Sequence, residues 1–257
     1  MRVISLNCNG IRAAARKGFF DWLQKQDADV VCLQEIKAME DQLDETFYPP
    51  GYHCYYHSAE KKGYSGVGLY AAHRPDEVIN GLGWDQFDAE GRCIEARFGN
   101  LSVVSLYMPS GSSADMRQQV KYRVMDRFFE QMRDWGASGR HYIICGDWNI
   151  AHRRIDIRNW RGNQKNSGFL PEERAWMERV FNELGWVDSF RQLYPEKEQY
   201  TWWSNRGQAW ANNTGWRIDY QIVTPALAET LQRSAVYTDE RFSDHAPLTV
   251  DYQHPIR

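Results

Sequence analysis

Short apolar runs recur along the chain, and most of them end at a polar side chain. Three runs predict buried strands, at residues 3–6, 29–33 and 141–145. Shorter segments separated by turn residues predict antiparallel or mixed pairing at 52–56, 66–71, 78–79, 93–98, 101–106, 217–223 and 248–252. Gly146 interrupts the third run just before Asp147 and Asn149. The side chains of these two residues would leave the same face of an extended chain.

Three segments predict helices. Residues 12–26 carry apolar side chains that suit a helix, and apolar residues recur at helical spacing from 116 to 135, with Ser112 and Ser113 as candidate caps. Pro171 opens the third helix, and Gly185 ends it. Strands occur in both halves, and no repeat or linker divides the chain. We therefore expect one domain spanning residues 1–257, with sheets at its centre.

Composition and charge narrow the class of protein. With 42% hydrophobic and 25% charged residues, the chain can bury a substantial core. The net charge of −3 means that a nucleic-acid binder would need its positive charge concentrated locally. Residues 153–165 form such a segment, which holds Arg153, Arg154, Arg158, Arg161 and Lys165.

Other features of the sequence predict a cytoplasmic location. The N-terminal segment contains the polar Asn7 and does not resemble a signal peptide, and no apolar run approaches the length of a membrane span. The cysteines form no Cys-x-x-Cys motif and are interpreted as small apolar residues in a reducing compartment. They are Cys8, Cys32, Cys54, Cys93 and Cys145.

Polar groups at strand ends and in loops suggest a common site. They are Asn7, Glu35, Tyr107, Asp147, Asn149, Asp219, Asp244 and His245. Oxygen ligands without a cysteine cluster favour a hard cation such as Mg²⁺ or Mn²⁺. Together with an Asp–His pair and a tyrosine hydroxyl, such a cation suits the hydrolysis of a phosphate ester. No Gly-x-Ser-x-Gly or phosphate-binding Gly-x-x-x-x-Gly-Lys-Ser/Thr motif competes with this interpretation.

Each of these residues also has a simpler interpretation. Asp147 and Asn149 would suit an Asx turn, and Glu35 would suit a solvated charge after a strand. Tyr107 could be a core tyrosine, and the Ser243-Asp244-His245 segment could be a turn. Asp219 could pair with a nearby arginine, Arg217 or Arg241. The prediction of a site therefore depends on the whole set.

The motifs resemble those of the exonuclease III family of apurinic/apyrimidinic (AP) endonucleases, bacterial members included, within the DNase I-like endonuclease/exonuclease/phosphatase superfamily. They occur in family order and span nearly the whole chain. They are Ser5-Leu6-Asn7-Cys8-Asn9-Gly10-Ile11-Arg12, Leu33-Gln34-Glu35, Tyr107-Met108-Pro109, Gly146-Asp147-Trp148-Asn149-Ile150-Ala151-His152, Gly162-Asn163-Gln164-Lys165-Asn166-Ser167-Gly168-Phe169, Gly215-Trp216-Arg217-Ile218-Asp219-Tyr220 and Ser243-Asp244-His245-Ala246-Pro247.

The resemblance implies a four-layer α/β sandwich, in which two mixed β-sheets pack face to face between helices. It implies Glu35 as the principal Mg²⁺ ligand, with Asn7 and Asp244 in the metal's shell. Asp147 would position or deprotonate the attacking water, and Asn149 would hold the phosphate. His245, oriented by Asp219, and Tyr107 would contact the scissile phosphate. The resemblance leaves open whether Asp147 or His245 is the base. It also leaves open whether one or two ions take part, with Asp147, Asn149 and His245 as possible contacts of the second.

The same resemblance implies substrate contacts. Asn163 and Asn166 match positions that grip the DNA backbone and the target site, and the basic segment around them predicts salt-dependent binding. Lys121 is a candidate phosphate contact, with a solvated helix face as the alternative. Trp202, Trp216 and Ile218 resemble an apolar pocket for an extruded abasic sugar, whereas Trp203 and Trp210 are interpreted as core residues. Asn9, a further candidate contact, stands where some members have an acidic residue, and Ser110 stands where many have Asn or Gln.

The sequence thus predicts a monomeric, Mg²⁺-dependent DNA-repair nuclease acting on duplex DNA. It would cut 5′ to abasic sites, with possible 3′–5′ exonuclease activity and removal of 3′ blocking groups. The alternative is a non-catalytic, RNA-associated regulator on the same fold, similar to the catabolite repression control protein, in which the metal and catalytic carboxylates are replaced. Here Glu35, Asp147 and Asp244 are retained. A phosphodiesterase acting on phosphoinositide or sphingomyelin is disfavoured by the asparagine segment and the tryptophan pocket.

Overall fold

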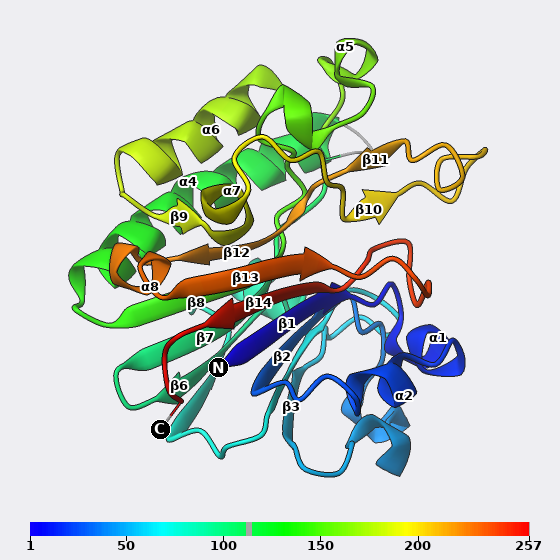
Figure 1. The fold of residues 1–257 in the computed structure, drawn as a ribbon, viewed down its shortest axis with the longest axis vertical. Helices are drawn as coiled ribbons and strands as arrows, with labels where there is room; N and C mark the ends of the chain where they lie inside the picture. The colour runs from blue at the N-terminus through cyan, green and yellow to red at the C-terminus, as the bar shows by residue number, and fades with distance from the viewer. Residues whose placement is uncertain (112–114, 257) are drawn as a thin grey trace.

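Two six-stranded sheets form the centre of the computed structural model, which describes residues 1–111 and 115–256 (Figure 1). In order across the first sheet, the strands are β13 (Leu231–Val236), β14 (Leu248–Tyr252), β1 (Arg2–Asn7), β2 (Val30–Gln34), β4 (Val67–Ala71) and β3 (His53–His57). In the second sheet they are β5 (Glu77–Asn80), β6 (Cys93–Phe98), β7 (Leu101–Tyr107), β8 (His141–Asp147), β12 (Asp219–Val223) and β9 (Val187–Asp188).

Both sheets are mixed. In the first, β1 and β2 are parallel and the other neighbours antiparallel. In the second, β7 and β8 are the parallel pair. Each parallel pair lies in the middle of its sheet and carries the apolar side chains of a strand buried on both faces. The predicted antiparallel or mixed pairing is confirmed.

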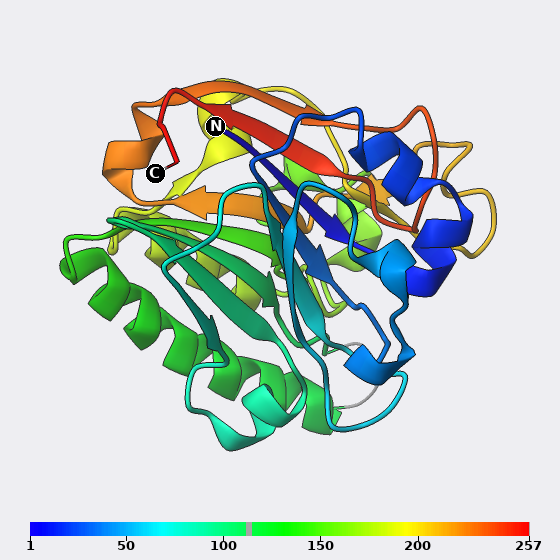
Figure 2. The ribbon, with the colours of Figure 1, turned by 90° about the horizontal axis from the view of Figure 1, so that it is seen from below.

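Helices cover the outer faces of the two sheets (Figure 2). Those on the side of the first sheet, and those of the loops near it, are α1 (Ile11–Arg16), α2 (Phe19–Leu23), η1 (Glu40–Gln42) and η2 (Glu45–Phe47). The remaining helices are α3 (Asp85–Ala89), which packs beside α4, and α4 (Asp115–Ala137), η3 (Arg154–Asp156), α5 (Trp160–Asn163), α6 (Pro171–Asn182), α7 (Ser189–Leu193) and α8 (Pro225–Ala228). Among the described residues, no helix has both the length and the apolar character needed to cross a membrane.

Three layers of buried side chains hold the elements together. One lies between the two sheets and includes Val103, Ile143 and Val250. The second packs α4 and α6 onto the second sheet, and the third packs α1 and α2 onto the first. Burial of apolar area at about 25 cal/mol per Å² is the main driving force for such layers. The predicted four-layer α/β sandwich is confirmed.

Several element boundaries differ from those predicted. The helix predicted at 12–26 is two helices, because Gly18 adopts a φ of 87° between them and ends the first. The third helix ends at Asn182, before Gly185. The long helix is confirmed from Asp115 onwards, and its candidate caps Ser112 and Ser113 lie outside the described residues. Of the five free cysteines only Cys54 is partly exposed, and the other four are buried as expected.

Four short or polar strands were not predicted, and one of them is β9, which has two residues at the edge of the second sheet. Strand β13 is an edge strand whose sequence includes Gln232, Arg233 and Ser234, so it lacks the apolar alternation of a half-buried strand. Strands β10 (Trp202–Trp203) and β11 (Gly215–Trp216) form a separate two-stranded hairpin beside the second sheet. This hairpin lies at the end of the molecule to which the carboxyl ends of β1, β2, β7 and β8 point (Figure 1).

Candidate active site

The ends of four central strands meet at one edge of the sandwich. Asn7 ends β1 and Glu35 follows β2, whereas Tyr107 ends β7 and Asp147 ends β8. Because each pair of strands is parallel, the carboxyl ends of both pairs lie at the same edge of their sheets. The first sheet therefore contributes Asn7 and Glu35, and the second contributes Tyr107 and Asp147, to one site.

Hydrogen bonds join these four residues across the two sheets. The Tyr107 hydroxyl donates to Glu35 Oε1 at 2.7 Å. Asn7 Nδ2 donates to Glu35 Oε1 at 3.2 Å and to Asp147 Oδ2 at 2.9 Å. Burial raises the pKa of Tyr107 well above its usual value, and the nearby Glu35 carboxylate adds to this shift. Tyr107 thus stays protonated and donates a hydrogen bond at neutral pH.

His245 and Asp219 form a buried pair beside Asp147. Asp219 lies directly opposite Asp147 in the antiparallel register of β12 and β8. His245 Nδ1 lies 2.8 Å from Asp219 Oδ2, and its Nε2 lies 3.8 Å from Asp147 Oδ2. Burial opposes the charged imidazolium, but the carboxylates of Asp219, Asp147 and Asp244 together outweigh burial and raise the pKa of His245 to about 10. His245 is therefore a cation at neutral pH, with Asp219 as its counter-ion.

Asp147 is a buried carboxyl group whose charge is only partly compensated. Burial raises its pKa to about 7, although the neighbouring His245 opposes this shift. Its other oxygen, Oδ1, accepts a hydrogen bond from the backbone nitrogen of Asn149 at 2.8 Å. Asn149 has a φ of 53°, an uncommon conformation that asparagine tolerates, and its Nδ2 donates to the carbonyl oxygen of Met108. A carboxyl group that changes its charge near neutral pH suits a proton acceptor.

The donor set at this edge fits a hard divalent cation. Glu35 and Asp147 present carboxylate oxygens, which Mg²⁺ and Mn²⁺ prefer, and Asn7 Nδ2 donates to both of them. The Asn7 Oδ1 atom accepts a hydrogen bond from the backbone nitrogen of Asn9. The buried Oδ1 of Asp219 has no hydrogen-bond partner among the described residues. Ligand atoms of Asp147, Asp219 and His245 also lie within 4.8 Å of one another, and this second cluster places Asp219 among the possible metal contacts. In that cluster His245 Nδ1 already pairs with Asp219.

Lys37 and Asn9 link Glu35 to Asp244, the last of the predicted metal contacts. Lys37 Nζ lies 2.7 Å from Glu35 Oε2 and donates to Asn9 Oδ1 at 2.6 Å. Asn9 Nδ2 in turn donates to Asp244 Oδ1 at 3.0 Å. Burial opposes ionisation of Glu35, but the Lys37 ammonium group and the Tyr107 hydroxyl lower its pKa overall. Asn9, predicted to contact substrate, is thus engaged with Lys37 and Asp244, and it lines a smaller pocket behind Asp244.

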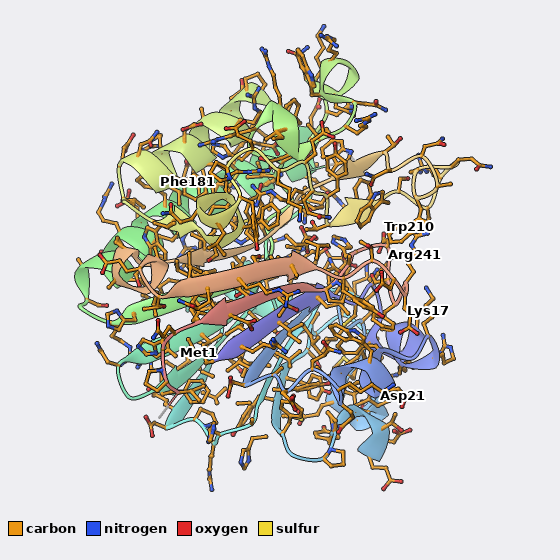
Figure 3. All side chains as sticks on the ribbon, in the orientation of Figure 1. Met1, Lys17, Asp21, Phe181, Trp210 and Arg241 are labelled. Carbon is orange, nitrogen blue, oxygen red and sulfur yellow. The ribbon has the colours of Figure 1, made fainter. Side chains whose placement is uncertain are left out.

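A cleft of about 950 Å³ opens over the site. Its wall contains the three residues predicted for a sugar pocket, Trp202, Trp216 and Ile218. The rings of the two tryptophans lie 6.0 Å apart and nearly perpendicular, at 82°. Trp203 is buried as expected, whereas Trp210 is only half-buried and stacks under Arg241 at the outer side of the hairpin (Figure 3). The cleft therefore joins an apolar wall to the polar strand ends.

The loop before α6 forms another part of the cleft wall. Lys165 and Asn166 are exposed and line the cleft, and Asn166 is one of the two asparagines predicted to contact substrate. Asn163 lies behind them, and its Oδ1 accepts a hydrogen bond from Asn166 Nδ2 at 2.8 Å. The structure thus brings Asn166 to the cleft and places Asn163 as its support.

The prediction that Lys121 contacts a DNA phosphate is wrong. Its side chain is completely buried between α4 and α6, where its ammonium group pairs with Glu173. A second bond runs from Lys121 Nζ to the carbonyl oxygen of Asn149 at 2.8 Å. The alternative of a solvated helix face is also wrong. Its helical position could not reveal this burial because the partner, Glu173, lies far along the chain.

Two residues of the site were missed by sequence analysis. Lys37 follows Glu35 by two positions and resembles an ordinary exposed lysine. Thr201 Oγ1 donates to Asp219 Oδ2 at 2.6 Å and accepts hydrogen bonds from the backbone nitrogens of Ile218 and Asp219. Neither residue type signals such a role in the sequence. Asp219 does not pair with an arginine, since Arg217 is buried against Asp156 and Asp188.

The arrangement of two sheets around a polar edge with a histidine–aspartate pair is that of a known class of hydrolases. The chain belongs to the Endonuclease/Exonuclease/phosphatase family, whose model matches residues 4–245. It is 40% identical to an exodeoxyribonuclease of Bacillus subtilis over 254 residues, covering 96% of this chain and 98% of the relative. The exonuclease III-type relationship predicted from the motifs is confirmed.

Two solved structures are similar over almost the entire chain. An AP endonuclease from Archaeoglobus fulgidus superposes with a TM-score of 0.90 at 27% identity, covering 99% of this chain and 100% of the other. A 3′ phosphatase, NExo from Neisseria, bound to a product DNA hairpin, has the same TM-score, identity and coverage. The family relationship thus extends to the complete two-sheet architecture.

Proposed function

We propose that this protein is a Mg²⁺-dependent DNA-repair nuclease that hydrolyses the phosphodiester bond 5′ to an abasic site. Exonuclease and 3′-phosphatase relatives extend the proposal to trimming of blocked 3′ ends and 3′–5′ resection. The observation that carries it is the position of the apolar wall of Trp202, Trp216 and Ile218, which lines the same cleft as Glu35, Asp147 and His245. A sugar without a base can leave the duplex and pack against this apolar wall at low cost, because no base stacking or base pairing is broken.

The roles of the residues follow from their charges and contacts. A Mg²⁺ ion held by Glu35, with Asn7 and Asp244 in its shell, would polarise the phosphate and offset its developing charge. His245 is protonated and bonded to Asp219, so it donates to a phosphate oxygen and does not serve as the base. Asp147, with a pKa near neutrality, accepts the proton of the attacking water.

Hydrolysis breaks the bond between phosphorus and the 3′ oxygen of the nucleotide before the abasic site. The phosphate remains on the abasic sugar, and the leaving 3′ oxygen must gain a proton to become a hydroxyl. Tyr107 holds its hydroxyl proton at the site and is our candidate for assisting that departure. Asn149, bonded to Asp147 through its backbone, holds the phosphate from the other side.

The test uses an end-labelled duplex with one abasic site, an intact duplex and a duplex with a 3′-phosphate end. We expect cleavage 5′ to the abasic site with Mg²⁺, substitution by Mn²⁺, and no cleavage in EDTA. Asp147→Asn should lower cleavage by at least about 100-fold, the usual contribution of a positioned base. Failure of the wild-type protein to cut any of these duplexes, together with tight RNA binding, would instead support the RNA-associated regulator.

We also propose the DNA partner, the oligomeric state and the location of the protein. Duplex DNA with abasic sites or blocked 3′ ends is the proposed partner, and the protein would act as a monomer in the cytoplasm. The exposed basic segment around Lys165 supports DNA binding, because clustered positive charge neutralises backbone phosphates despite the net charge of −3.

A further inference from the structure

A completely buried charge pair lies between the catalytic strand end and the loop that forms the cleft wall. Lys121 comes from α4 and Glu173 from the first turn of α6, and neither side chain is exposed. Burying two charges costs several kcal/mol per ion before their attraction is counted. Such a pair is weak evidence for stability, so its contacts must show what it does here.

On one side, the pair holds the backbone of Asn149. Lys121 Nζ donates to the carbonyl oxygen of Asn149 at 2.8 Å. Asn149 has a φ of 53°, in the left-handed region, where a non-glycine residue persists only when its surroundings fix it. The ammonium group is therefore a support for the residue proposed to hold the phosphate.

On the other side, the pair holds the substrate loop. Glu173 Oε2 accepts hydrogen bonds from the backbone nitrogens of Gly168 at 2.6 Å and Leu170 at 3.0 Å. Its Oε1 accepts from Gln118 Nε2 at 3.1 Å in addition to Lys121. Gly168 and Leu170 belong to the loop that carries Lys165 and Asn166 along the cleft.

The two sides meet at Gly168. Its carbonyl oxygen accepts a hydrogen bond from the backbone nitrogen of Ala151 at 2.7 Å, two residues after Asn149. A Cβ atom at Gly168 would lie 3.2 Å from the Asn149 carbonyl oxygen and 3.1 Å from the Trp216 ring. The phosphate residue, the substrate loop and the sugar pocket thus pack against one another at the point that Lys121 and Glu173 hold.

We propose that Lys121 and Glu173 form a buried clamp that fixes Asn149 relative to the substrate loop, and that both are positioning residues for the nuclease reaction. This inference rests on the proposed function. The clamp acts on the rate of the bound complex, because it orients groups that contact the phosphate. It adds nothing to the electrostatic attraction of DNA, because a buried lysine paired with glutamate neutralises no phosphate.

The decisive variants are Lys121→Met, Glu173→Gln and the double variant, with Lys165→Met as matched control. We expect Lys121→Met to lower single-turnover cleavage of the abasic duplex by about 10- to 100-fold, the effect of a small misplacement of catalytic groups. Its affinity for the duplex in EDTA, and the slope of log affinity against log salt, should match the wild type. Lys165→Met should instead reduce that slope by about one unit, because Lys165 is an exposed cation on the cleft wall.

A second readout needs neither DNA nor activity. The amides of Gly168 and Leu170 donate to Glu173, so hydrogen exchange in the peptide covering residues 166–170 should accelerate in the single variants and in the double variant. The double variant removes both charges and so avoids an unpaired buried ion, which keeps the test valid if a single variant fails to fold. In a folded double variant, slow cleavage with unchanged salt slope supports the clamp.

Three results would overturn the clamp. One is a salt slope reduced by Lys121→Met as in Lys165→Met, which would indicate a phosphate contact. Another is wild-type cleavage in the folded double variant, and the third is unchanged exchange at 166–170 in that variant. A wild-type protein that cuts no duplex would refute the proposed function instead, and the exchange measurement would still decide whether the clamp holds the loop.

Discussion

His245 owes its charge to the carboxylates around it. Asp219 contributes most, and together with Asp147 and Asp244 it raises the pKa of His245 to about 10 against the effect of burial. A pKa raised in the folded state adds stability that is complete below the unfolded pKa of about 6.5 and is lost as the pH rises towards the folded pKa. The pair should therefore stabilise the protein most at pH 6 and least at pH 10.

Asp219→Asn tests both the charge and its role. We expect the free energy of unfolding of the variant to fall below that of the wild type at pH 6, with a smaller gap at pH 10, as measured by urea denaturation. Cleavage at neutral pH should fall by at least about 100-fold, because the imidazole loses its counter-ion and its orientation. Asp251→Asn, which removes a surface ion pair with Arg2, is the control. For this variant, the difference in free energy of unfolding from the wild type should not become smaller between pH 6 and pH 10. If Asp219→Asn is destabilised by the same amount at pH 6 and pH 10, Asp219 is not the counter-ion that keeps His245 protonated.

At the scale of single residues, sequence motifs predicted which side chains meet but not how they are held. Glu35 and Asp147 stand out because each comes at the end of an apolar run, and His245 stands out because an aspartate precedes it just before a predicted strand. Lys37, Thr201 and the true role of Lys121 depend on partners distant in sequence, and no local pattern carries that information. Lys121 in particular has the helical spacing of an exposed residue, and only the packing of α6 against α4 buries it.

Strand β8 depends on a glycine that no other residue can replace without displacing β7. Gly146 has a φ of 148°, and a Cβ atom there would lie 1.9 Å from the carbonyl oxygen of Leu106. The neighbouring register pair is Tyr107 opposite Asp147, so any separation of the strands moves two active-site residues.

Gly146→Ala should thus cost about 3 kcal/mol or more in free energy of unfolding, from backbone strain together with overlap. Cleavage should fall more steeply than stability explains. Gly139→Ala is the matched control, since Gly139 also has a positive φ, 79°, but a Cβ atom there meets nothing within 4 Å. Its cost should stay near 1 kcal/mol, the penalty for a left-handed alanine. Equal losses of free energy of unfolding in Gly146→Ala and Gly139→Ala would show that overlap with the Leu106 carbonyl oxygen adds nothing to the cost.

The β10–β11 hairpin links the sugar pocket to the predicted metal shell. Trp202 Nε1 donates to Asp244 Oδ2 at 3.1 Å while its ring lines the cleft beside Trp216. Trp202→Phe removes this hydrogen bond and keeps an aromatic ring. We expect the Mg²⁺ concentration for half-maximal cleavage to rise about 3- to 10-fold, since a hydrogen bond to a charged group is lost. Direct Mn²⁺ binding without DNA should weaken in parallel.

Trp203→Phe is the control from the same hairpin, because its indole nitrogen bonds to Asn213 and not to a predicted metal contact. Identical Mn²⁺ affinities for both variants and the wild type would rule out the link. Sequence patterns could not reveal this hairpin as an element, because β10 and β11 have two residues each and their pairing spans a polar loop. Its tryptophans were recognised only through the family motifs.

At the scale of the whole molecule, the active site is part of the interface between the sheets. Asn7 of the first sheet bonds to Asp147 of the second, and Gln34 bonds to Ser105 in the same way. Further from the site, Gln221 Nε2 of β12 donates to the carbonyl oxygen of Val3 in β1. Polar contacts therefore cross the apolar layer from the active site into its interior.

The class of the fold could be predicted, but its strand order could not. Frequent short strands separated by turn residues indicate antiparallel or mixed sheets. Nothing in the local pattern of residues 2–7 shows that β1 pairs with β14, which lies near the other end of the chain. Pairings of this kind depend on the packing of the complete chain, and the family resemblance implied two mixed sheets packed face to face without giving their strand order.

Because the two sheets share both a core and an active site, we propose that they unfold as one unit. Urea titrations followed by far-UV circular dichroism and by tryptophan fluorescence should give coincident single transitions. Fluorescence reports both sides, since Trp22 packs outside the first sheet and Trp176 outside the second. Two separated transitions would show that one sheet is stable alone. In that case the hydrogen bonds from Asn7 to Asp147 and from Tyr107 to Glu35 would join two independent units and not one domain.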